Sequence, residues 1–587
     1  MNEPSPATTT KNFRRRSWSE LYVSSVILLL LLLALQAIGQ ENTTNNPPSR
    51  VARISYLQGD VSFLRAGINQ WSQASLNFPA TTGDRIYAGK HARAELEVGP
   101  YVARIWERTD LTVTNLNDQI MQLGLAEGSL RVTIRELASG NTVEVDTPNG
   151  ALTLQRQGKY RVDVDRKGDQ TTVSVIDGEL EVTGGGVSQA VNAGQAVRLT
   201  GRESIQVESI PMPPPDAFDA WCEERDLRLT SSKSADYINP DTPGFEDLDE
   251  YGHWTEIEEY GPVWFPPVAV GWIPYRFGHW VWIDPWGWTW VEDEPWGFCQ
   301  FHFGRWVLVG ATWGWIPGPL LVPPVYAPAF VAFLGGPGFS FGVGVGLVGW
   351  FPLGPRDPFF PWYHYGGNYL NVINVTNIRN VTNVTNIINV TNINEVHYAY
   401  RDVATTAVPQ RVFSSGQQVA KQMVHVSPQQ LAKAQVIPHP AVNPTRQAAM
   451  AGKPVPAPPV RTQPRFATAQ RATPTRTGAV ASTRQGSPTR NQPPAENASR
   501  SSAPAGRTQP AIRSEPPDLV TRAAPPRPSV PFLKRLGSMA VHPGRPLEPA
   551  QVEHLREGVP VGPMVDREFP PHPFGIARGP RPRPRLR

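Results

Sequence analysis

The sequence predicts a mainly β protein in three parts: a β-sandwich or roll, a Trp-rich domain of repeated β-hairpins, and a long disordered tail rich in Pro and Arg. Three observations support this prediction. Short runs of alternating apolar and polar residues fill 51–200, tryptophans recur every 26 residues after 251, and the composition changes after 436. With 587 residues, 62 Pro and 50 Gly, the chain is too long and too uneven for one uniform domain.

The N-terminus carries an export signal. Four basic residues precede the apolar run 26–35, namely Lys11, Arg14, Arg15 and Arg16. Such charge keeps the N-terminus in the cytoplasm and sends the following chain across the membrane. The small residues before Gln40 fit a cleaved signal peptide over 1–39. The charge-free stretch 21–39 is also nearly long enough to span a bilayer as a signal-anchor helix in the inner membrane. Both outcomes place the rest of the chain in the periplasm or envelope.

Residues 50–205 form the predicted β domain. Apolar and polar residues alternate in runs such as 53–57, 94–98 and 171–175. Turn pairs such as Gly59-Asp60 and Asp177-Gly178 separate the runs, and Gly supplies the backbone conformation that tight turns need. This pattern at roughly ten-residue spacing is typical of a sandwich or roll with an aliphatic core.

The same domain resembles the FecR family in the order and spacing of six short motifs. They are Gln58-Gly-Asp-Val61, Thr82-Gly-Asp-Arg-Ile86, Ala92-Arg-Ala-Glu-Leu96, Glu127-Gly-Ser-Leu130, Thr147-Pro-Asn-Gly150 and Ala193-Gly-Gln195. The resemblance implies the periplasmic β domain of a membrane regulator of iron uptake, which a cytoplasmic anti-sigma segment and a transmembrane helix precede. Only about 20 to 25 residues precede the apolar run here, fewer than the about 40 that an independent domain needs, so we do not expect direct control of a sigma factor.

Residues 206–250 are predicted to be a Pro-rich and acidic linker with one helix around Trp221. Cys222 lies in this linker and Cys299 in the next domain, and they are the only two cysteines. Two cysteines are too few for a disulfide-rich scaffold or a cysteine-only zinc cluster. Export permits one bridge between them, and the sequence does not decide whether it forms.

Residues 251–361 contain the tryptophan repeat. Gly252-His-Trp254, Gly278-His-Trp280 and Gly304-Arg-Trp306 recur with a period of 26, and twelve of the eighteen tryptophans lie in these copies. In the central copy, two alternating runs flank the turn at 284–287, which predicts a hairpin for each copy.

The tryptophans have two interpretations. Their rings form the core of a small sheet, or one row stays exposed as a platform for sugar rings or quaternary amines. The candidate platform residues are Trp254, Trp280, Trp282, Trp288, Trp290 and Trp306. The nearby His253, His279 and His302 suggest a metal site, but two of them are the same position in successive repeats, so we expect no metal.

This block also resembles a domain of unknown function, with Tyr-x-Trp-Gly-x-Trp-like repeats, that often follows a FecR domain in bacterial envelope proteins. The matching motifs include Tyr251-Gly-His-Trp254, Trp288-Thr-Trp290, Asp293-Glu-Pro-Trp-Gly297, Pro324-Val-Tyr-Ala-Pro328 and Gly349-Trp-Phe-Pro-Leu-Gly-Pro355. The resemblance implies an architecture but no activity, ligand or site residues. Seven glycines in the charge-free segment 329–351 favour a loop or strand over a second membrane span.

The last two segments are low in complexity. Residues 362–435 contain Asn-Val-Thr triplets, for which we expect partial β order or an extended linker. Residues 436–587 carry 23 Lys and Arg against 8 Asp and Glu, a net charge of +15 that leaves −11 for residues 1–435. Pro is frequent in this tail and apolar residues are sparse, which predicts disorder. An exported basic tail suits anionic envelope polymers, and its lack of stacking aromatics argues against nucleic acid.

The sequence contains no motif for a nucleophile, a metal protease site or a nucleotide-binding loop. We therefore expect a non-enzymatic, FecR-like envelope protein without catalytic residues or cofactors. The first hypothesis is that it binds or scaffolds an envelope component such as peptidoglycan, lipopolysaccharide or another anionic glycan. The alternative is a membrane-anchored, FecR-like sensor that takes part in signal transduction. The sequence does not predict the oligomeric state.

Overall fold

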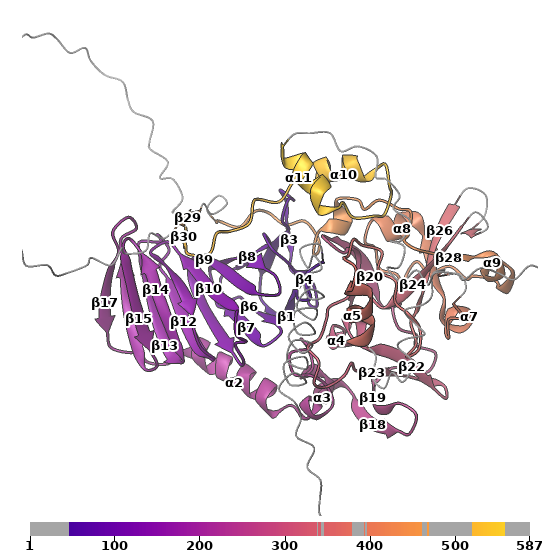
Figure 1. Ribbon diagram of the computed structural model, residues 1–587, viewed down its shortest axis with the longest axis horizontal. Coiled ribbons are helices and arrows are strands. Elements are labelled where there is room, and N and C mark those ends of the chain that lie inside the picture. The colour runs from indigo at the N-terminus through magenta and orange to yellow at the C-terminus, as the bar shows by residue number, and fades with distance from the viewer. Residues whose placement is uncertain are drawn as a thin grey trace, which may run out of the picture.

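The computed structural model describes residues 46–336, 339–341, 345–377, 393, 396–460, 466–468 and 519–557. Two β-rich domains lie side by side, and two short helices near the C-terminus sit above their junction (Figure 1). The predicted export signal lies outside the described residues. Among the described helices, none has the length and apolar character that crossing a bilayer requires.

The first domain is a sandwich of two sheets that share one long strand, β9 (Ile120–Ile134). In spatial order the first sheet contains β4 (Pro79–Ala80), β1 (Ala52–Gln58), β6 (Arg93–Val98), β7 (Tyr101–Ile105), the end of β9, β12 (Gly158–Val164), β13 (Gln170–Asp177), β16 (Gln195–Thr200) and β17 (Gln206–Ile210). The second sheet contains β3 (Trp71–Gln73), β2 (Val61–Leu64), β5 (Arg85–Ala88), β8 (Thr109–Leu116), the start of β9, β10 (Thr142–Thr147), β11 (Gly150–Leu154), β14 (Glu179–Gly184) and β15 (Val187–Asn192). The predicted sandwich is confirmed.

Gly128 is the point at which β9 passes from one sheet to the other. Residues before it pair with β8, and residues from it onward pair with β7 and β12. Gly128 has a φ of +95°, which disfavours residues with a side chain. A Cβ here would lie 2.5 Å from the Thr109 backbone. Aliphatic side chains such as Leu125 and Leu130 fill the space between the sheets on either side of this bend.

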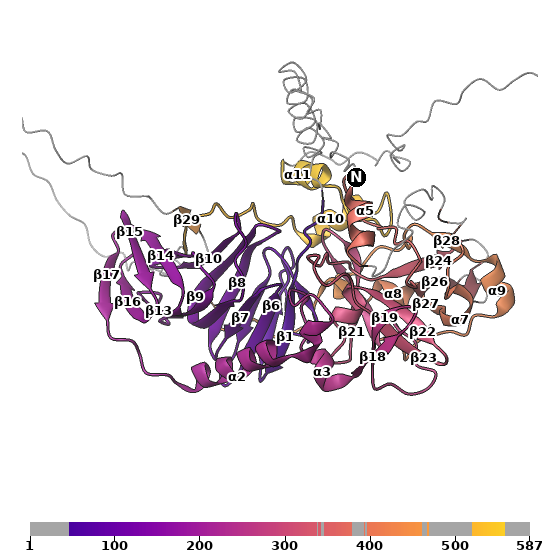
Figure 2. The ribbon, with the colours of Figure 1, turned by 60° about the horizontal axis from the view of Figure 1, so that its bottom comes forward.

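The linker between the domains is folded. It contains α2 (Ala217–Ser231), the 3₁₀ turn η2 (Lys233–Asp236) and α3 (Asp247–Tyr251). Asp216 caps α2 by accepting hydrogen bonds from the first turn, and Asp219 completes a capping box. The predicted helix is therefore present, but it lies along the first domain rather than forming part of a loose tether (Figure 2).

The tryptophan repeat folds as three hairpins, as predicted. They are β18 (His253–Ile257) with β19 (Gly261–Phe265), β20 (Gly278–Ile283) with β21 (Gly287–Glu292), and β22 (Arg305–Val309) with β23 (Thr312–Ile316). The outer hairpins join through β19 and β23 into one four-stranded sheet, while the middle hairpin forms a sheet of its own. The short α4 (Cys299–His302) connects the second and third copies.

The Gly-rich segment is strand and turn rather than a membrane span. Strand β26 (Val345–Pro352) pairs with β24 (Val331–Gly335), β25 (Ser340–Phe341) and β27 (Thr406–Pro409), and β24 also pairs with β28 (Gln435–Ile437). The short helices α7 (Arg401–Ala404), α8 (Gln410–Ser414) and α9 (Pro428–Lys433) and the 3₁₀ turn η4 (Gln447–Ala449) complete this part.

The start of the Asn-rich segment is helical, which differs from the expected β order. It forms α5 (Tyr369–Val375). Because residues three apart share a helix face, the triplet spacing turns Asn374 and Asn377 toward the protein. Asn374 Nδ2 donates to the Phe359 backbone carbonyl at 3.0 Å, and Asn377 Oδ1 accepts from the Gly304 backbone N–H at 3.0 Å. Residues 378–392 lie outside the described residues.

Parts of the segment predicted to be disordered from 436 are ordered. Besides β28 and η4, they include β29 (Phe466–Thr468), β30 (Leu519–Thr521), α10 (Phe532–Met539) and α11 (Pro549–Glu557). The Phe532 N–H donates to the Gly67 carbonyl at 2.9 Å, and Met539 and Leu555 are buried. The prediction of disorder used the composition of the whole segment, in which these short apolar stretches are outnumbered by Pro and polar residues. The remaining tail residues lie outside the described ranges.

The two cysteines do not form a bridge. Cys222 and Cys299 are both buried as free thiols, one on α2 and one on α4.

We predict that Gly128→Ala lowers the free energy of unfolding by about 3 kcal/mol or more, because it adds a backbone clash to an unfavourable φ. Gly140→Ala is the matched control, since Gly140 also has a positive φ but has nothing within 4 Å of an added Cβ. It should cost only about 1 kcal/mol. Urea denaturation of the two variants checks this, and equal losses would show that the bend in β9 is not constrained as described.

Candidate functional site

The predicted platform tryptophans are mostly core residues. Five of the six are at most 1% exposed, namely Trp280, Trp282, Trp288, Trp290 and Trp306. In the middle hairpin the rings of Trp280 and Trp290 meet edge to face with centroids 5.4 Å apart, and Trp282 and Trp288 do the same. A platform needs an exposed ring face, and these five rings have none. The structure therefore supports the other interpretation for these five rings, in which they form the core.

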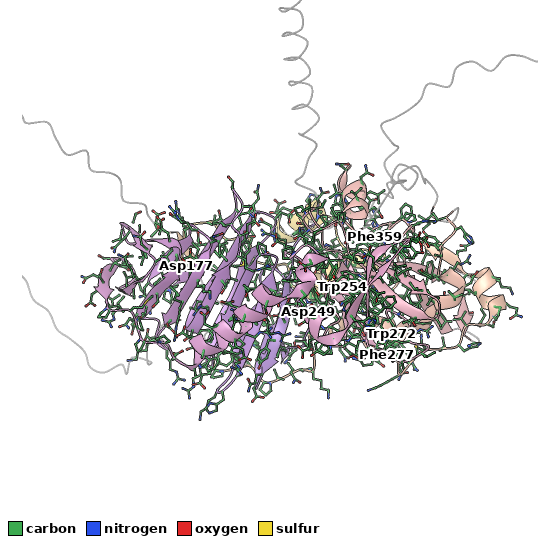
Figure 3. The ribbon with its side chains drawn as sticks, turned by 90° about the horizontal axis from the view of Figure 1, so that it is seen from below. Asp177, Asp249, Trp254, Trp272, Phe277 and Phe359 are labelled. Atoms are coloured by element: carbon green, nitrogen blue, oxygen red, sulfur yellow. The ribbon has the colours of Figure 1, made fainter. Side chains whose placement is uncertain are left out.

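Trp254 differs from the other five because it is partly exposed. One face of its ring stacks on Tyr237 at a centroid distance of 4.7 Å. Its Nε1 donates to Ser234 Oγ at 2.9 Å, and Ser234 donates in turn to Asp249. Asp249 and Trp254 lie near the junction of the domains (Figure 3). Trp254 thus ties β18 to the linker.

The three histidines do not converge. His302 is buried, its Nδ1 lies 2.8 Å from the Ala327 carbonyl oxygen, and burial lowers its pKa to about 3. His279 faces Asp293 at 3.7 Å, and His253 is exposed on β18. Within the described ranges no three His, Cys, Asp or Glu side chains are grouped so as to hold a metal ion.

The most unusual chemistry lies on the outer face of the first sheet, beneath α2. Side chains alternate across a strand, so residues between the core positions point outward toward the helix. On this face the sheet carries Arg53, Glu95, Glu97, Arg104, Arg131, Lys159 and Arg161. We call this row, together with the acidic residues that cover it, the ionic interface.

The acidic residues on α2 follow the helical repeat. Asp219, Glu223 and Asp226 are four and three residues apart, which puts them on one face. Arg131 binds Asp219 at 2.9 Å and Glu223 at 2.5 Å. Arg104 binds Asp226 at 2.6 Å. An acidic helix face therefore covers a basic row on the sheet.

Glu95 is the centre of this contact. Its carboxylate accepts from Arg104 Nε at 2.5 Å and from Arg225 Nε at 3.1 Å, and it is fully buried. Burial alone raises the pKa of Glu95, but the attraction of Arg104 and Arg225 outweighs it and lowers the pKa to about 2. Glu95 therefore stays ionised in the interior.

Arg53 extends the ionic interface to the second domain. Its guanidinium donates to Asn77 Oδ1 at 3.1 Å, to Glu97 at 3.3 Å and to Asp247 on α3. It also donates to the Pro295 carbonyl at 3.2 Å and lies 5.5 Å from the centre of the Phe298 ring, both in the second domain. Arg53 thus joins β1, the linker and the Trp-rich domain.

The backbone and acids around Arg53 fit this guanidinium closely. Gly244 has a φ of +85°, and a Cβ there would lie 2.5 Å from Arg53 Nη1, so glycine is needed. Burial, followed by repulsion from Glu97 and Asp247, raises the pKa of Glu246 well above its ordinary value. Glu246 is therefore harder to ionise than a glutamate in water, since its charge would add to those of Glu97 and Asp247.

A cavity of about 250 Å³ lies at the same junction. Arg50 and Tyr101 line it from the first domain, Asp241 from the linker, and Phe303 and Pro324 from the second. Burial raises the pKa of Asp241. Closure of the domains against each other therefore sets the shape of this cavity.

The ionic interface is costly to open in part. Buried ion pairs add little net stability when intact, but breaking one leaves an unpaired charge at a cost of about 3–5 kcal/mol. A partly opened interface leaves charges without partners and out of contact with water. The ionic interface was not predicted from the sequence, because charged residues that alternate with apolar ones along a strand predict a solvent-exposed face. The acidic spacing at 219, 223 and 226 was the available signal.

Comparison with known proteins identifies both domains. Residues 84–181 match the family described as FecR protein, and residues 245–357 match a family of unknown function, DUF6600. The sandwich is longer than its matched part, since it runs from β1 to β17.

Two solved structures of a proposed anti-sigma factor from Parabacteroides distasonis are similar in part. One is 14% identical with a TM-score of 0.21, over 24% of this chain and 64% of that one. The other is 15% identical with a TM-score of 0.20, over 22% and 60%. The chain thus spans less than two thirds of these structures, and such scores support no argument about function. No curated protein matches the chain.

We predict that Trp288→Ala lowers the free energy of unfolding by about 3–5 kcal/mol, because the ring is fully buried. Trp254→Ala should cost clearly less, since that ring is partly exposed. Guanidinium denaturation followed by circular dichroism measures both. A small loss for Trp288→Ala would argue that its ring is a surface feature.

The ionic interface should be destabilised at both ends of the pH range. Glu95 has a lowered pKa, so its contribution is complete above about pH 4.5 and is lost as the pH falls toward 2. Glu246 has a raised pKa, so its contribution is complete below about pH 4.5 and is lost as the pH rises through that raised value.

The melting temperature of the full chain as a function of pH tests this. Glu246→Gln, which cannot ionise, should reduce the loss that accompanies rising pH and leave the acid part unchanged. The same decline with rising pH in the wild type and in Glu246→Gln would rule out this assignment.

Proposed function

Because the chain carries a FecR domain followed by a DUF6600 domain, we propose that it is a non-enzymatic signal-transduction protein of the FecR type. In this proposal the linker passes a change in one domain to the other. The protein acts outside the cytoplasmic membrane, as its export signal predicts, and a separate partner carries the signal onward.

The observation that supports this proposal most directly is the position of Arg53. One guanidinium binds Glu97 on the first sheet, Asp247 on the linker and the Pro295 carbonyl of the second domain. Asn77, which binds Arg53, also donates to the Glu294 carbonyl at 2.8 Å. A movement of the second domain therefore alters contacts made by β1.

The proposed relay uses an open state of the ionic interface in addition to the closed state that the structure shows. A ligand that binds one domain better in the open state shifts the equilibrium toward that state, and the other domain experiences the same shift. Opening lifts the acidic face of α2 from Arg104 and Arg131. These uncovered cations are a change that an anionic partner can recognise.

The scaffold hypothesis receives less support. Binding of peptidoglycan, lipopolysaccharide or another anionic glycan was inferred from an exposed row of rings and from the basic tail. Five of the six rings are buried, and much of the tail lies outside the described residues. The relay instead uses contacts that the described residues make.

We predict that Arg53→Met in the native host changes transcription in the same set of genes as deletion of the whole chain. Arg198→Met is the matched control, because Arg198 lies on the same sheet but pairs with Glu208 at the exposed surface. RNA sequencing of the four strains, with the amount of each protein checked by immunoblot, makes the comparison.

Asp247→Asn separates signalling from misfolding, because it keeps the shape of the linker side chain and removes the charge that faces Arg53. It should reproduce the effect of Arg53→Met. If deletion changes no defined set of transcripts, the protein is not a relay. If deletion changes a defined set of transcripts and a stable Arg53→Met protein does not change that set, Arg53 is not the coupling element.

A further inference from the structure

The second sheet has a polar groove on its outer face. Val143 and Val145 of β10 point into the core, so Glu144 and Asp146, which alternate with them, point outward. Gln122 on the neighbouring β9 lies beside Glu144. All three polar side chains are nevertheless fully buried, because residues 519–523 lie over them. We call these three residues with Gly124 the strand groove.

The strand groove recognises the backbone of this segment. Glu144 accepts from the N–H groups of Arg522 at 2.8 Å and Ala523 at 3.0 Å. Gln122 Nε2 donates to Thr521 Oγ1 at 2.7 Å and to the Ala523 carbonyl at 2.9 Å. Thr521 also donates to Glu144 at 3.2 Å. Two side chains thus satisfy both donors and acceptors of an extended peptide.

Side chains of the segment add shape and charge. Leu519 is fully buried, and a Cβ on Gly124 would lie 2.7 Å from its Cδ1, so the absence of a side chain at Gly124 makes room for Leu519. At the rim, Arg522 binds Glu181 at 2.6 Å. The groove therefore selects an aliphatic residue, a threonine and a basic residue in the order Leu-x-Thr-Arg.

The segment is distant in sequence from the sheet it covers. It follows β10 by more than 370 residues, and it meets that strand in the ladder through Val520 and Thr147. From β30 the chain runs across the first domain to α10 and α11 at the junction (Figure 2). There Arg535 pairs with Asp284 of the second domain.

Several polar atoms of the groove are not used by its occupant. Both carboxylate oxygens of Asp146 and Oε1 of Gln122 are buried without a hydrogen-bond partner among the residues that the structure describes. Thr183 Oγ1, on β14 of the same sheet, is also buried without a hydrogen-bond partner among the described residues. Such atoms are rare in protein interiors and indicate capacity for further contacts.

From these contacts we propose that the strand groove is a peptide-binding site and that residues 519–523 are its resident ligand, replaceable by a free peptide of the same chemistry. Release of this segment frees the chain that leads to α10 and α11 from the first domain. The proposal concerns binding alone and does not depend on the proposed signalling function.

The carboxyl pair makes occupancy dependent on pH. Burial, and then the neighbouring Glu144, raise the pKa of Asp146 well above its ordinary value. The groups facing it are Glu144, Gln122 and Thr521, while Arg522 is engaged by Glu181. Docking is therefore complete at low pH and weakens as the pH rises through the raised pKa of Asp146.

Hydrogen exchange of the full chain tests whether the segment docks as described. Backbone amides 519–523 should be protected in the wild type and exposed in Leu519→Asp. Gly124→Ala should expose them as well, because its Cβ occupies the space of Leu519, and adding Leu519→Ala should restore part of the protection. Leu533→Asp is the control, since Leu533 is 67% exposed on α10. Equal exchange at 519–523 in the wild type and Leu519→Asp would overturn the proposal.

Direct binding tests whether the site accepts a separate ligand. A fluorescent synthetic peptide of residues 518–524 should bind the full-length Leu519→Asp chain, whose groove is vacant, and should bind the wild type weakly. The same peptide with Thr521→Val should bind about tenfold more weakly or worse, because it loses its hydroxyl contacts with Gln122 and Glu144.

The affinity should fall with rising pH, and Asp146→Asn, added to the Leu519→Asp chain, should flatten that dependence. Absence of peptide binding to a folded Leu519→Asp chain would refute the peptide site even if transcription responds to Arg53→Met as proposed above.

Discussion

A guanidinium buried where three parts of the chain meet is the interaction on which the two-domain arrangement depends. Removing Arg53 from water is favourable only with charged partners in place, so Glu97 and Asp247 must both reach it. That requirement fixes α3 against β1, and the crowding at Gly244 and the ring of Phe298 follow from the same position. The charges of the linker therefore fix the position of one domain relative to the other.

The two domains on either side of this contact have different kinds of core. The first has an aliphatic core between two sheets that β9 holds together, so neither sheet can slide without breaking that strand. The second has a core of tryptophans, and in its middle hairpin the rings meet edge to face across the two strands. Close-packed cores do not deform gradually. The junction between them is polar instead, with the buried ion pairs of Arg53 and the cavity near Arg50.

Much of the fold could be predicted from sequence, because its signals are local. Alternation and turn pairs predicted the sandwich, and the 26-residue period predicted the three hairpins. The interface could not be predicted in the same way: Glu95 and Arg104 alternate like surface residues, and their partner residues Arg225 and Asp226 lie more than 100 positions away. The strand groove could not be predicted for the same reason, since its occupant is far away in the sequence. That occupant also belongs to a segment whose composition is typical of a disordered tail. The burial of the tryptophans needed the structure, since a periodic ring pattern is equally compatible with a core and with a platform.

If Arg53 makes the two domains one cooperative unit, differential scanning calorimetry of the full chain should show it. The wild type and the surface variant Arg198→Met should each unfold in one transition that includes both domains. Arg53→Met should unfold in two transitions, with the aliphatic and aromatic domains melting separately. A single transition in Arg53→Met, merely moved to a lower temperature, would show that the domains remain coupled without this guanidinium.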